Sequence, residues 1–192
     1  MDALERHLDR MDPSHANEKE AKEDKGKKMT DRERYTPGPA SGAQIQKDGE
    51  KWTLILVREL HHPPARVWQA LTDPAHLSEW APFDADLNAD AAGCREYREA
   101  GRGAKAVEYS WGGNDLRWEL EPIGSGTRLT LWHNIDRRFI AMGAAGWQIC
   151  FDVLERLLAG EPIGRIVGGE AMKFGWQRLH ADYAKQFESI EA

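Results

Sequence analysis

The chain has 192 residues, of which 41% are hydrophobic and 30% are charged, and its net charge is −6. This length suits one domain with appendages or two small domains. The negative balance argues against a nucleic-acid partner, because phosphate backbones are bound mainly through Lys and Arg. Eight Trp residues are unusual and indicate a wide core or a lined pocket.

Localisation signals point to a reducing cytoplasm. No stretch approaches ~18 uninterrupted apolar residues, so no membrane span is predicted. The first residues mix acidic and basic side chains, unlike a signal peptide. Two cysteines, Cys94 and Cys150, give no disulfide framework, and Cys150 lies in an apolar run typical of a buried small side chain.

Residues 1–43 are predicted to be a disordered charged tail and linker. Residues 1–40 hold nine Lys or Arg and ten Asp or Glu, with few large apolar side chains. Such a segment cannot bury enough surface to offset its ordering entropy. The stretch TPGPASG at 36–42 has the composition of a linker. The sequence leaves open whether Met1, Met11 or Met29 is the translation start.

Regular structure is predicted from residue 51 onward. Residues 51–60 are rich in β-formers and predict a strand. Pro63 and Pro64 then open a helix over 65–73, since proline is tolerated in a first turn. A second short helix is expected over 74–80, capped by Thr72 or Asp73.

An antiparallel meander follows, with alternating apolar and polar residues over 106–111, 115–122 and 128–134. Two helices come next. Residues 140–158 have a broad apolar face, with Gly160 as a stop. Small residues over 143–146 would let that helix lie close to the sheet. A last amphipathic helix is predicted over 169–187.

This order of elements resembles the START-like SRPBCC superfamily. The closest likeness is to the type named after the C-terminal domain of the activator of heat-shock protein 90 ATPase. The likeness covers about 110 residues, and the matching residues are Pro63-Pro64, Val67-Trp68, Ala70 to Pro74, Leu77, Trp80, Glu119 to Pro122, Gly126 to Leu129, His133 and Gly146-Trp147. It implies an α+β helix-grip (START/Bet v-like) fold, in which a curved antiparallel sheet wraps round a long C-terminal helix.

The likeness sets the expected domain limits. Residues 44–160 form the START-like domain, and residues 161–192 form a C-terminal helical extension. The sequence departs from the family pattern between Trp80 and Trp111, where two or three good strands are usual. Residues 88–105 are rich in Arg, Glu, Ala and Gly, so it stays open whether they form strands or leave a pocket wall incomplete.

Ligand-binding candidates follow from the likeness together with strand and helix periodicity. They are Trp80, Tyr109, Trp111, Trp118, Leu131, His133, Trp147 and Phe151. For any single Trp, plain core filling competes with ligand contact. Trp132 has the opposite strand parity and is expected beneath the last helix or at an interface between two copies.

Polar candidates are few. Strand parity places His133 on the inner face, where it would orient a ligand oxygen or act as an acid or base, with a hydrogen-bonded core histidine as the alternative. If Leu56 and Leu60 face inward, Arg58 does too, and a buried guanidinium needs a carboxylate partner from the protein or a ligand. His61 and His62 point to opposite faces of a strand, so neither a metal nor a cofactor is predicted.

The predicted function is a module that binds a small hydrophobic ligand in an internal cavity. No catalytic motif is evident, so catalysis would fall to His133 alone. A chaperone-associated interaction module and a cyclase- or hydrolase-like enzyme are the alternatives, since one fold supports many functions. A homodimer is also left open.

Overall fold

The computed structural model describes residues 29–83, 94–98, 105–111 and 113–191. Residues before Tyr35 belong to a unit of their own. That unit contains the short helix α3 (Asp31–Arg34), which a capping box begins. The Glu33 N–H donates to Thr30 Oγ1 over 3.2 Å, and the Thr30 N–H donates to Glu33 Oε2 over 2.7 Å.

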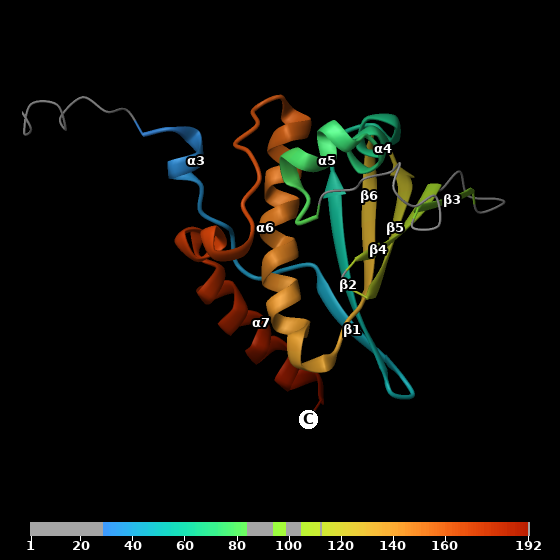
Figure 1. Cartoon of the computed structure of the whole chain (residues 1–192), viewed down its shortest axis with the longest axis vertical. Helices are drawn as coiled ribbons and strands as arrows, with labels where there is room; N and C mark the ends of the chain where they lie inside the picture. The colour runs from blue at the N-terminus through green and yellow to red at the C-terminus, as the bar shows by residue number, and fades with distance from the viewer. Residues whose placement is uncertain (1–28, 84–93, 99–104, 112, 192) are drawn as a thin grey trace, which may run out of the picture. The chain divides into compact units, whose positions relative to one another are not determined.

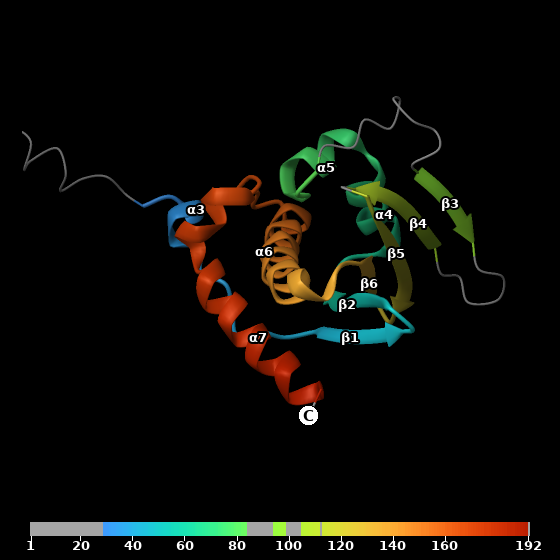
Figure 2. The same cartoon turned by 60° about the horizontal axis from the view of Figure 1, so that its bottom comes forward.

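Residues from Tyr35 onward build one antiparallel sheet in the order β1-β2-β6-β5-β4-β3. The strands are β1 (Ala43–Asp48), β2 (Lys51–Leu60), β3 (Cys94–Arg98), β4 (Lys105–Trp111), β5 (Asn114–Ile123) and β6 (Gly126–Asn134). Leu56 of β2 lies opposite Leu131 of β6, so the first long strand pairs with the last. The sheet curves round helix α6 (Ile140–Ala159), which is seen nearly end-on in Figure 2. This is the predicted helix-grip arrangement.

Two short helices connect β2 to the rest of the sheet (Figure 1). Helix α4 (Pro64–Thr72) begins with a proline, which lacks the N–H that the first turn would leave unpaired. Asp73 ends this helix and caps α5 (Pro74–Trp80), because its side chain accepts from the Ala75 N–H over 2.9 Å. Both predicted helices are confirmed.

Helix α6 packs closely against the sheet because the residues in its first turns have small side chains. A Cβ on Gly143 would lie 3.1 Å from a methyl group of Ile135 and 3.4 Å from one of Leu54, closer than most packed side chains allow. The helix ends at Gly160, whose φ of 83° is the left-handed conformation that glycine adopts without strain. The predicted helix and its stop are therefore confirmed.

Alternating side chains of the strands supply the core. Leu54 and Leu56 of β2 are buried, whereas Ile55 and Val57 are half-buried on the other face. The inner face of the other strands is also buried, through Val107, Tyr109, Leu116, Trp118, Leu120, Leu129, Leu131 and His133. Within the described residues, no helix is both long and apolar enough to span a bilayer.

Three elements differ from the predicted ones. Strand β1 was not predicted, because its residues, AQIQKD, alternate weakly. Strand β3 forms within 88–105 despite its charged composition, since β4 supplies its pairing partner; the rest of that region lies outside the described residues. The last helix, α7 (Trp176–Glu191), begins later than residue 169, because Gly168–Phe174 is a 3₁₀ segment (η3) and Gly175 has φ 81°.

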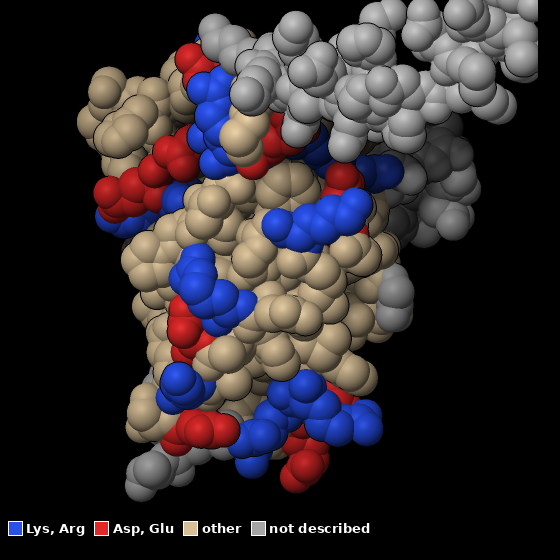
Figure 3. All heavy atoms as spheres, turned by 90° about the vertical axis from the view of Figure 1, so that its left-hand side faces the viewer, with Lys and Arg blue, Asp and Glu red and all other residues tan. Residues whose placement is uncertain are grey.

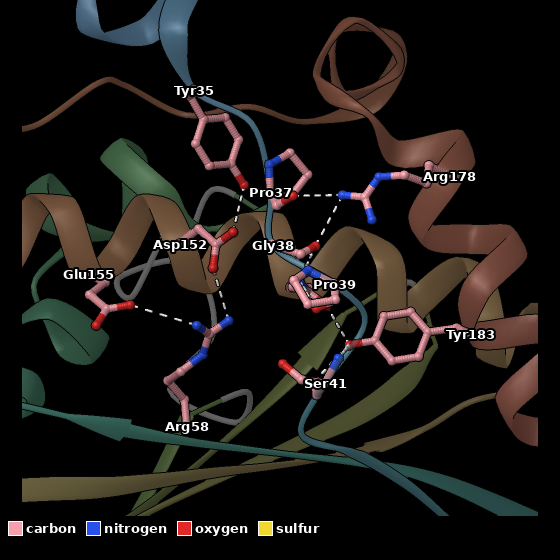
Figure 4. A network of polar contacts seen from close by, with 11 residues as sticks. Tyr35, Pro37, Gly38, Pro39, Ser41, Arg58, Asp152, Glu155, Arg178 and Tyr183 are labelled. Atoms are coloured by element: carbon pink, nitrogen blue, oxygen red, sulfur yellow. Dashed lines mark hydrogen bonds and ion pairs between the residues drawn. The ribbon is translucent and has the colours of Figure 1, made fainter.

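Residues 35–42, here called the strap, lie against α6 and α7 rather than forming a free linker (Figure 4). Tyr35 and Pro37 are buried. Arg178 donates to the carbonyl oxygens of Pro37 and Gly38 over 2.6 and 3.0 Å. Tyr183 lies 2.8 Å from the Ser41 carbonyl oxygen and accepts from the Ser41 N–H over 3.1 Å. Backbone groups of a Pro-Gly segment are thus satisfied by side chains of the C-terminal helix.

Charge is mixed on the side of the molecule where α7 lies. Figure 3 shows Lys and Arg interspersed with Asp and Glu around a broad uncharged area. Among the described residues on that face, positive charge is therefore not gathered into a patch that would attract a phosphate backbone.

Candidate functional site

An aromatic cluster lies between the inner face of the sheet and α6. It comprises Trp80, Phe83, Tyr109, Trp111, Trp118, His133, Trp147 and Phe151. The sheet contributes four of its members, α6 contributes two, and the segment at and after the end of α5 contributes two. Strand alternation turns Tyr109, Trp118 and His133 to the same face, and helical spacing brings Trp147 and Phe151 opposite them.

The rings pack edge to face around Trp147. Its ring centroid lies 5.3 Å from Trp118, 6.0 Å from Trp111 and 6.1 Å from His133, with interplanar angles of 80°, 75° and 88°. Aromatic quadrupoles favour this geometry over face-to-face stacking. Trp147 is 2% exposed, so the cluster is dry around it.

Trp147 fixes the tautomer of His133. The indole Nε1–H donates to His133 Nδ1 over 3.0 Å. An indole N–H can only donate, so Nδ1 must hold a lone pair and not a proton. The neutral imidazole therefore carries its proton on Nε2, which is buried and has no hydrogen-bond partner among the described residues.

Burial also keeps this imidazole neutral. Desolvation lowers the pKa of His133 from its usual 6.5 to about 4. At neutral pH the His133 imidazole is thus uncharged. Its Nε2–H is a hydrogen-bond donor, and its Nδ1 already accepts from Trp147. Trp118 is a second case on the same inner face: its Nε1–H is buried without a partner among the described residues.

The cluster reaches solvent at Trp111. This side chain is 37% exposed, whereas Phe83 is 9% exposed and His133 is 3% exposed. Trp111 lies 6.2 Å from His133 and 5.9 Å from Phe83, measured between ring centroids. The buried imidazole is therefore one ring away from the surface.

The remaining polar hydrogen bonds within the cluster hold it to the short helices. Trp80 donates its Nε1–H to the Ala70 carbonyl over 2.9 Å, and the Tyr109 hydroxyl donates to the Leu71 carbonyl over 2.5 Å. Both carbonyls belong to the last turn of α4. These bonds position the two rings and engage the polar hydrogen of each residue.

Arg58 pairs with a carboxylate of the protein itself (Figure 4). Its guanidinium lies 2.9 Å from Asp152 and 3.7 Å from Glu155, and it also lies over the ring of Phe151 at 5.9 Å. Asp152 accepts a further hydrogen bond from the Tyr35 hydroxyl over 2.8 Å. Burial raises the pKa of Tyr35, so this hydroxyl stays protonated and donates. Of the two predicted partners for Arg58, the protein's own is present.

A polar hollow lies on the outer face of the sheet. It has a volume of about 660 Å³ and polar walls that include Gln46, Asp48, Thr53 and Asn134. Trp132 also lines it, half-buried beneath Arg117, whose guanidinium lies 5.4 Å from the ring centroid. The prediction that Trp132 packs beneath the last helix is wrong, because α7 covers α6 rather than the outer face of the sheet.

The described residues offer no group of three His, Cys, Asp or Glu side chains able to hold a metal ion. Cys150 is equally unsuited to ligate one, because burial raises the pKa of its thiol to about 12. The chemistry that the cluster provides is apolar contact and neutral hydrogen-bond donation.

Of the eight predicted ligand-binding residues, seven lie on the inner face of the sheet or on α6 and Trp80 lies at the end of α5; seven of the eight belong to the aromatic cluster. Leu131 is the eighth; it is fully buried and lies opposite Trp118 in the ladder. Phe83 was not among the predicted residues. Its only signal is that it is an isolated aromatic residue three positions after the end of α5, just before a run of mostly polar residues.

The fold and this inner-face cluster define a START-like SRPBCC helix-grip domain. Residues 61–159, which are 99 of the 192, match the family described as "Activator of Hsp90 ATPase homolog 1-like protein", and the chain belongs to this family. No curated protein matches the sequence.

Solved structures show the same fold. CalU16 from Micromonospora echinospora is 22% identical; its crystal structure matches with a TM-score of 0.51 over 75% of this chain and 93% of its own. EF2215 from Enterococcus faecalis, titled a conserved protein of unknown function, is 12% identical. It matches with a TM-score of 0.53 over 78% of this chain and 92% of its own. At these identities the likeness extends to the fold alone.

Proposed function

We propose that the chain is a binding module that takes a small, flat, apolar ligand at the Trp111 edge of the aromatic cluster. The observation that carries the proposal is the exposed Trp111 in ring contact with the buried His133, Phe83 and Trp147. Apolar and aromatic walls with a few placed polar groups are typical of small-molecule sites.

Binding at this edge involves movement of side chains. The described rings fill the space beside α6, with centroids 5.3 to 6.4 Å apart. A flat ligand would replace ring contacts of Trp111 by contacts of its own, at little cost in dispersion energy. Trp111 is the member best placed to move, since more than a third of it already lies in solvent.

A binding role fits His133 better than a role as general base. A base needs a free lone pair, and the lone pair of Nδ1 is occupied by Trp147 while Nε2 carries the proton. The enzyme alternative would require this bond to break first. The proposal therefore assigns no catalytic step. The cytoplasmic location predicted from the sequence stays part of the proposal, and fractionation of cells followed by immunoblotting would check it.

Fluorescence titration and thermal shift with a panel of flat aromatic compounds test the proposal. Trp111→Ala is expected to weaken binding of a hit at least tenfold, since large aromatic anchors carry much of a site's affinity. Trp132→Ala is the matched control, because it removes a half-buried Trp from the opposite face. Equal losses in both variants, or the absence of any hit, would contradict the proposal.

A further inference from the structure

Resting on this proposed function, we infer that the ligand presents a neutral carbonyl oxygen, as in an aryl ketone or quinone, to His133 Nε2–H. The inference concerns which apolar molecules the site prefers. It follows from one unpaired donor, from the bond that fixes it as a donor, and from the groups that surround it.

The donor is fixed by the protein before any ligand arrives. Trp147 occupies Nδ1, so Nε2 must carry the proton, and the nitrogen lies in a side chain that is 97% removed from solvent. A buried donor without an acceptor destabilises the protein that contains it. A hydrocarbon leaves that donor unpaired, whereas a carbonyl oxygen accepts from it.

Charge excludes an anionic ligand. Within the part of the chain that the structure describes, the cationic side chain that lies over a ring of the cluster is Arg58, and its guanidinium is already paired with Asp152 at 2.9 Å. A carboxylate moved beside His133 would lose its hydration and gain only neutral donors. A neutral acceptor avoids that penalty.

A hydroxyl suits this donor less well than a carbonyl does. A hydroxyl could accept from Nε2–H, but it would then need an acceptor for its own proton. The other nitrogen of the imidazole, Nδ1, already accepts from Trp147. A carbonyl group brings no proton and therefore needs no acceptor from the protein.

Matched ligands of one shape separate this inference from the proposed function. Affinities of the full chain for 9-fluorenone, 9-fluorenol and fluorene are measured by fluorescence titration. The expected order is ketone, alcohol, hydrocarbon, with fluorenone at least tenfold tighter than fluorene. Equal affinity for all three would overturn the inference and leave the proposed function standing. If none binds although other flat aromatic compounds do, the inference fails alone; if nothing flat and apolar binds, both fail.

Variants test whether His133 is the donor. His133→Leu is expected to reduce the preference for fluorenone over fluorene to about onefold, and His133→Gln, which keeps an N–H donor, to restore part of it. Nitrogen NMR of the wild-type imidazole does not depend on how the variants fold. Fluorenone is expected to shift the protonated Nε2 resonance, and fluorene to leave it nearly unchanged. A protonated Nδ1, or no shift with bound ketone, would contradict the assignment.

Discussion

At the scale of single residues, the interior combines one neutral imidazole with one ion pair. His133 is surrounded by rings and is paired only with Trp147. Arg58 and Asp152 form an ion pair, with Tyr35 and Glu155 as further partners. The neutral His133 makes the free energy of unfolding depend on pH. The pair of Arg58 and Asp152 links strand β2 to α6.

The lowered pKa of His133 predicts a loss of stability in mild acid. Its pKa is about 4 in the folded protein and 6.5 when unfolded. Between these values the unfolded chain binds more protons, so stability is fully present above pH 6.5 and falls as the pH drops towards 4. The full effect is about 3 kcal/mol, from about 1.36 kcal/mol per pKa unit.

Urea unfolding at pH 7, 5.5 and 4 measures this dependence. Because carboxylates also titrate in this range, the informative quantity is the difference between the wild type and His133→Gln. That variant is expected to lose less stability in acid than the wild type. His76→Gln is the control, since the His76 side chain is 38% exposed beside Asp73. Identical pH profiles for the wild type and His133→Gln would show that His133 is not buried in neutral form.

Strand parity was sufficient to place His133 on the inner face. It placed Arg58 there only on the condition that Leu56 and Leu60 face inward, because both faces of that strand are apolar from Leu54 to Val57. Parity says which face of a sheet a side chain takes, and it needs only the local sequence. It could not predict the bond from Trp147 to His133, because that bond depends on how α6 is rotated and shifted against the sheet. Those two quantities are set by the packing of the whole inner face.

At the scale of elements, the strap and α7 act as one cover for α6. Buried side chains of α7 include Leu179, Tyr183 and Phe187. Tyr183 lies 2.5 Å from Oε1 of Gln148 on α6, and Gln148 Nε2 donates to the Pro39 carbonyl over 3.1 Å. Gln148 thus joins the helix to both covering segments. Composition alone predicted a free linker at 36–42, because it is silent on partners that lie more than a hundred residues away.

Removal of α7 is expected to unfold or aggregate the domain. A chain ending at Gly160 would expose the side of α6 that α7 covers. It would also lose six buried hydrophobic residues, Ile163, Ile166, Ala171, Leu179, Tyr183 and Phe187, of which the larger ones contribute about 1.5–3 kcal/mol each. This is comparable with the total stability of a domain, about 5–15 kcal/mol. A chain ending at Phe187 is the control, since Glu188 and Ser189 are exposed.

Thermal unfolding followed by circular dichroism, together with size-exclusion chromatography, measures both truncations. The chain ending at Phe187 is expected to unfold cooperatively as a well-dispersed species. A cooperative transition near the wild-type temperature for the chain ending at Gly160 would show that residues 61–159, the part that the family match covers, fold without the extension.

At the scale of the whole molecule, β2 and β6 bring residues 51–60 and 126–134 together at the centre of the sheet. Their pairing closes a long loop, so the sheet depends on two segments that lie far apart in the sequence. The order of elements was enough to predict this arrangement through the family likeness. The order of elements could not predict the edge strands β1 and β3. Each of them is stabilised by pairing with a neighbouring strand more than by the β-propensity of its own residues.

Hydrogen exchange is expected to follow the sheet order. Amides of β2, β5 and β6, which have paired neighbours on both sides, and those in the middle of α6 should exchange most slowly. Amides of β1 and β3 have one paired neighbour and should exchange orders of magnitude faster. Native-state exchange followed by mass spectrometry measures the gradient. Slow exchange in β1 matching that in β6 would indicate that another surface covers this edge.

The clamp between the strap and α7 also has a consequence for natural variation. Arg178 and Tyr183 hydrogen-bond to the backbone of residues 37–41, which α6 also contacts through Gln148. A lineage that loses the helix leaves the Pro-Gly segment without the hydrogen bonds from Arg178 and Tyr183. One that loses the segment leaves the buried Tyr183 without the Ser41 backbone as a partner. The two segments, at opposite ends of the domain, should therefore be gained and lost together among relatives.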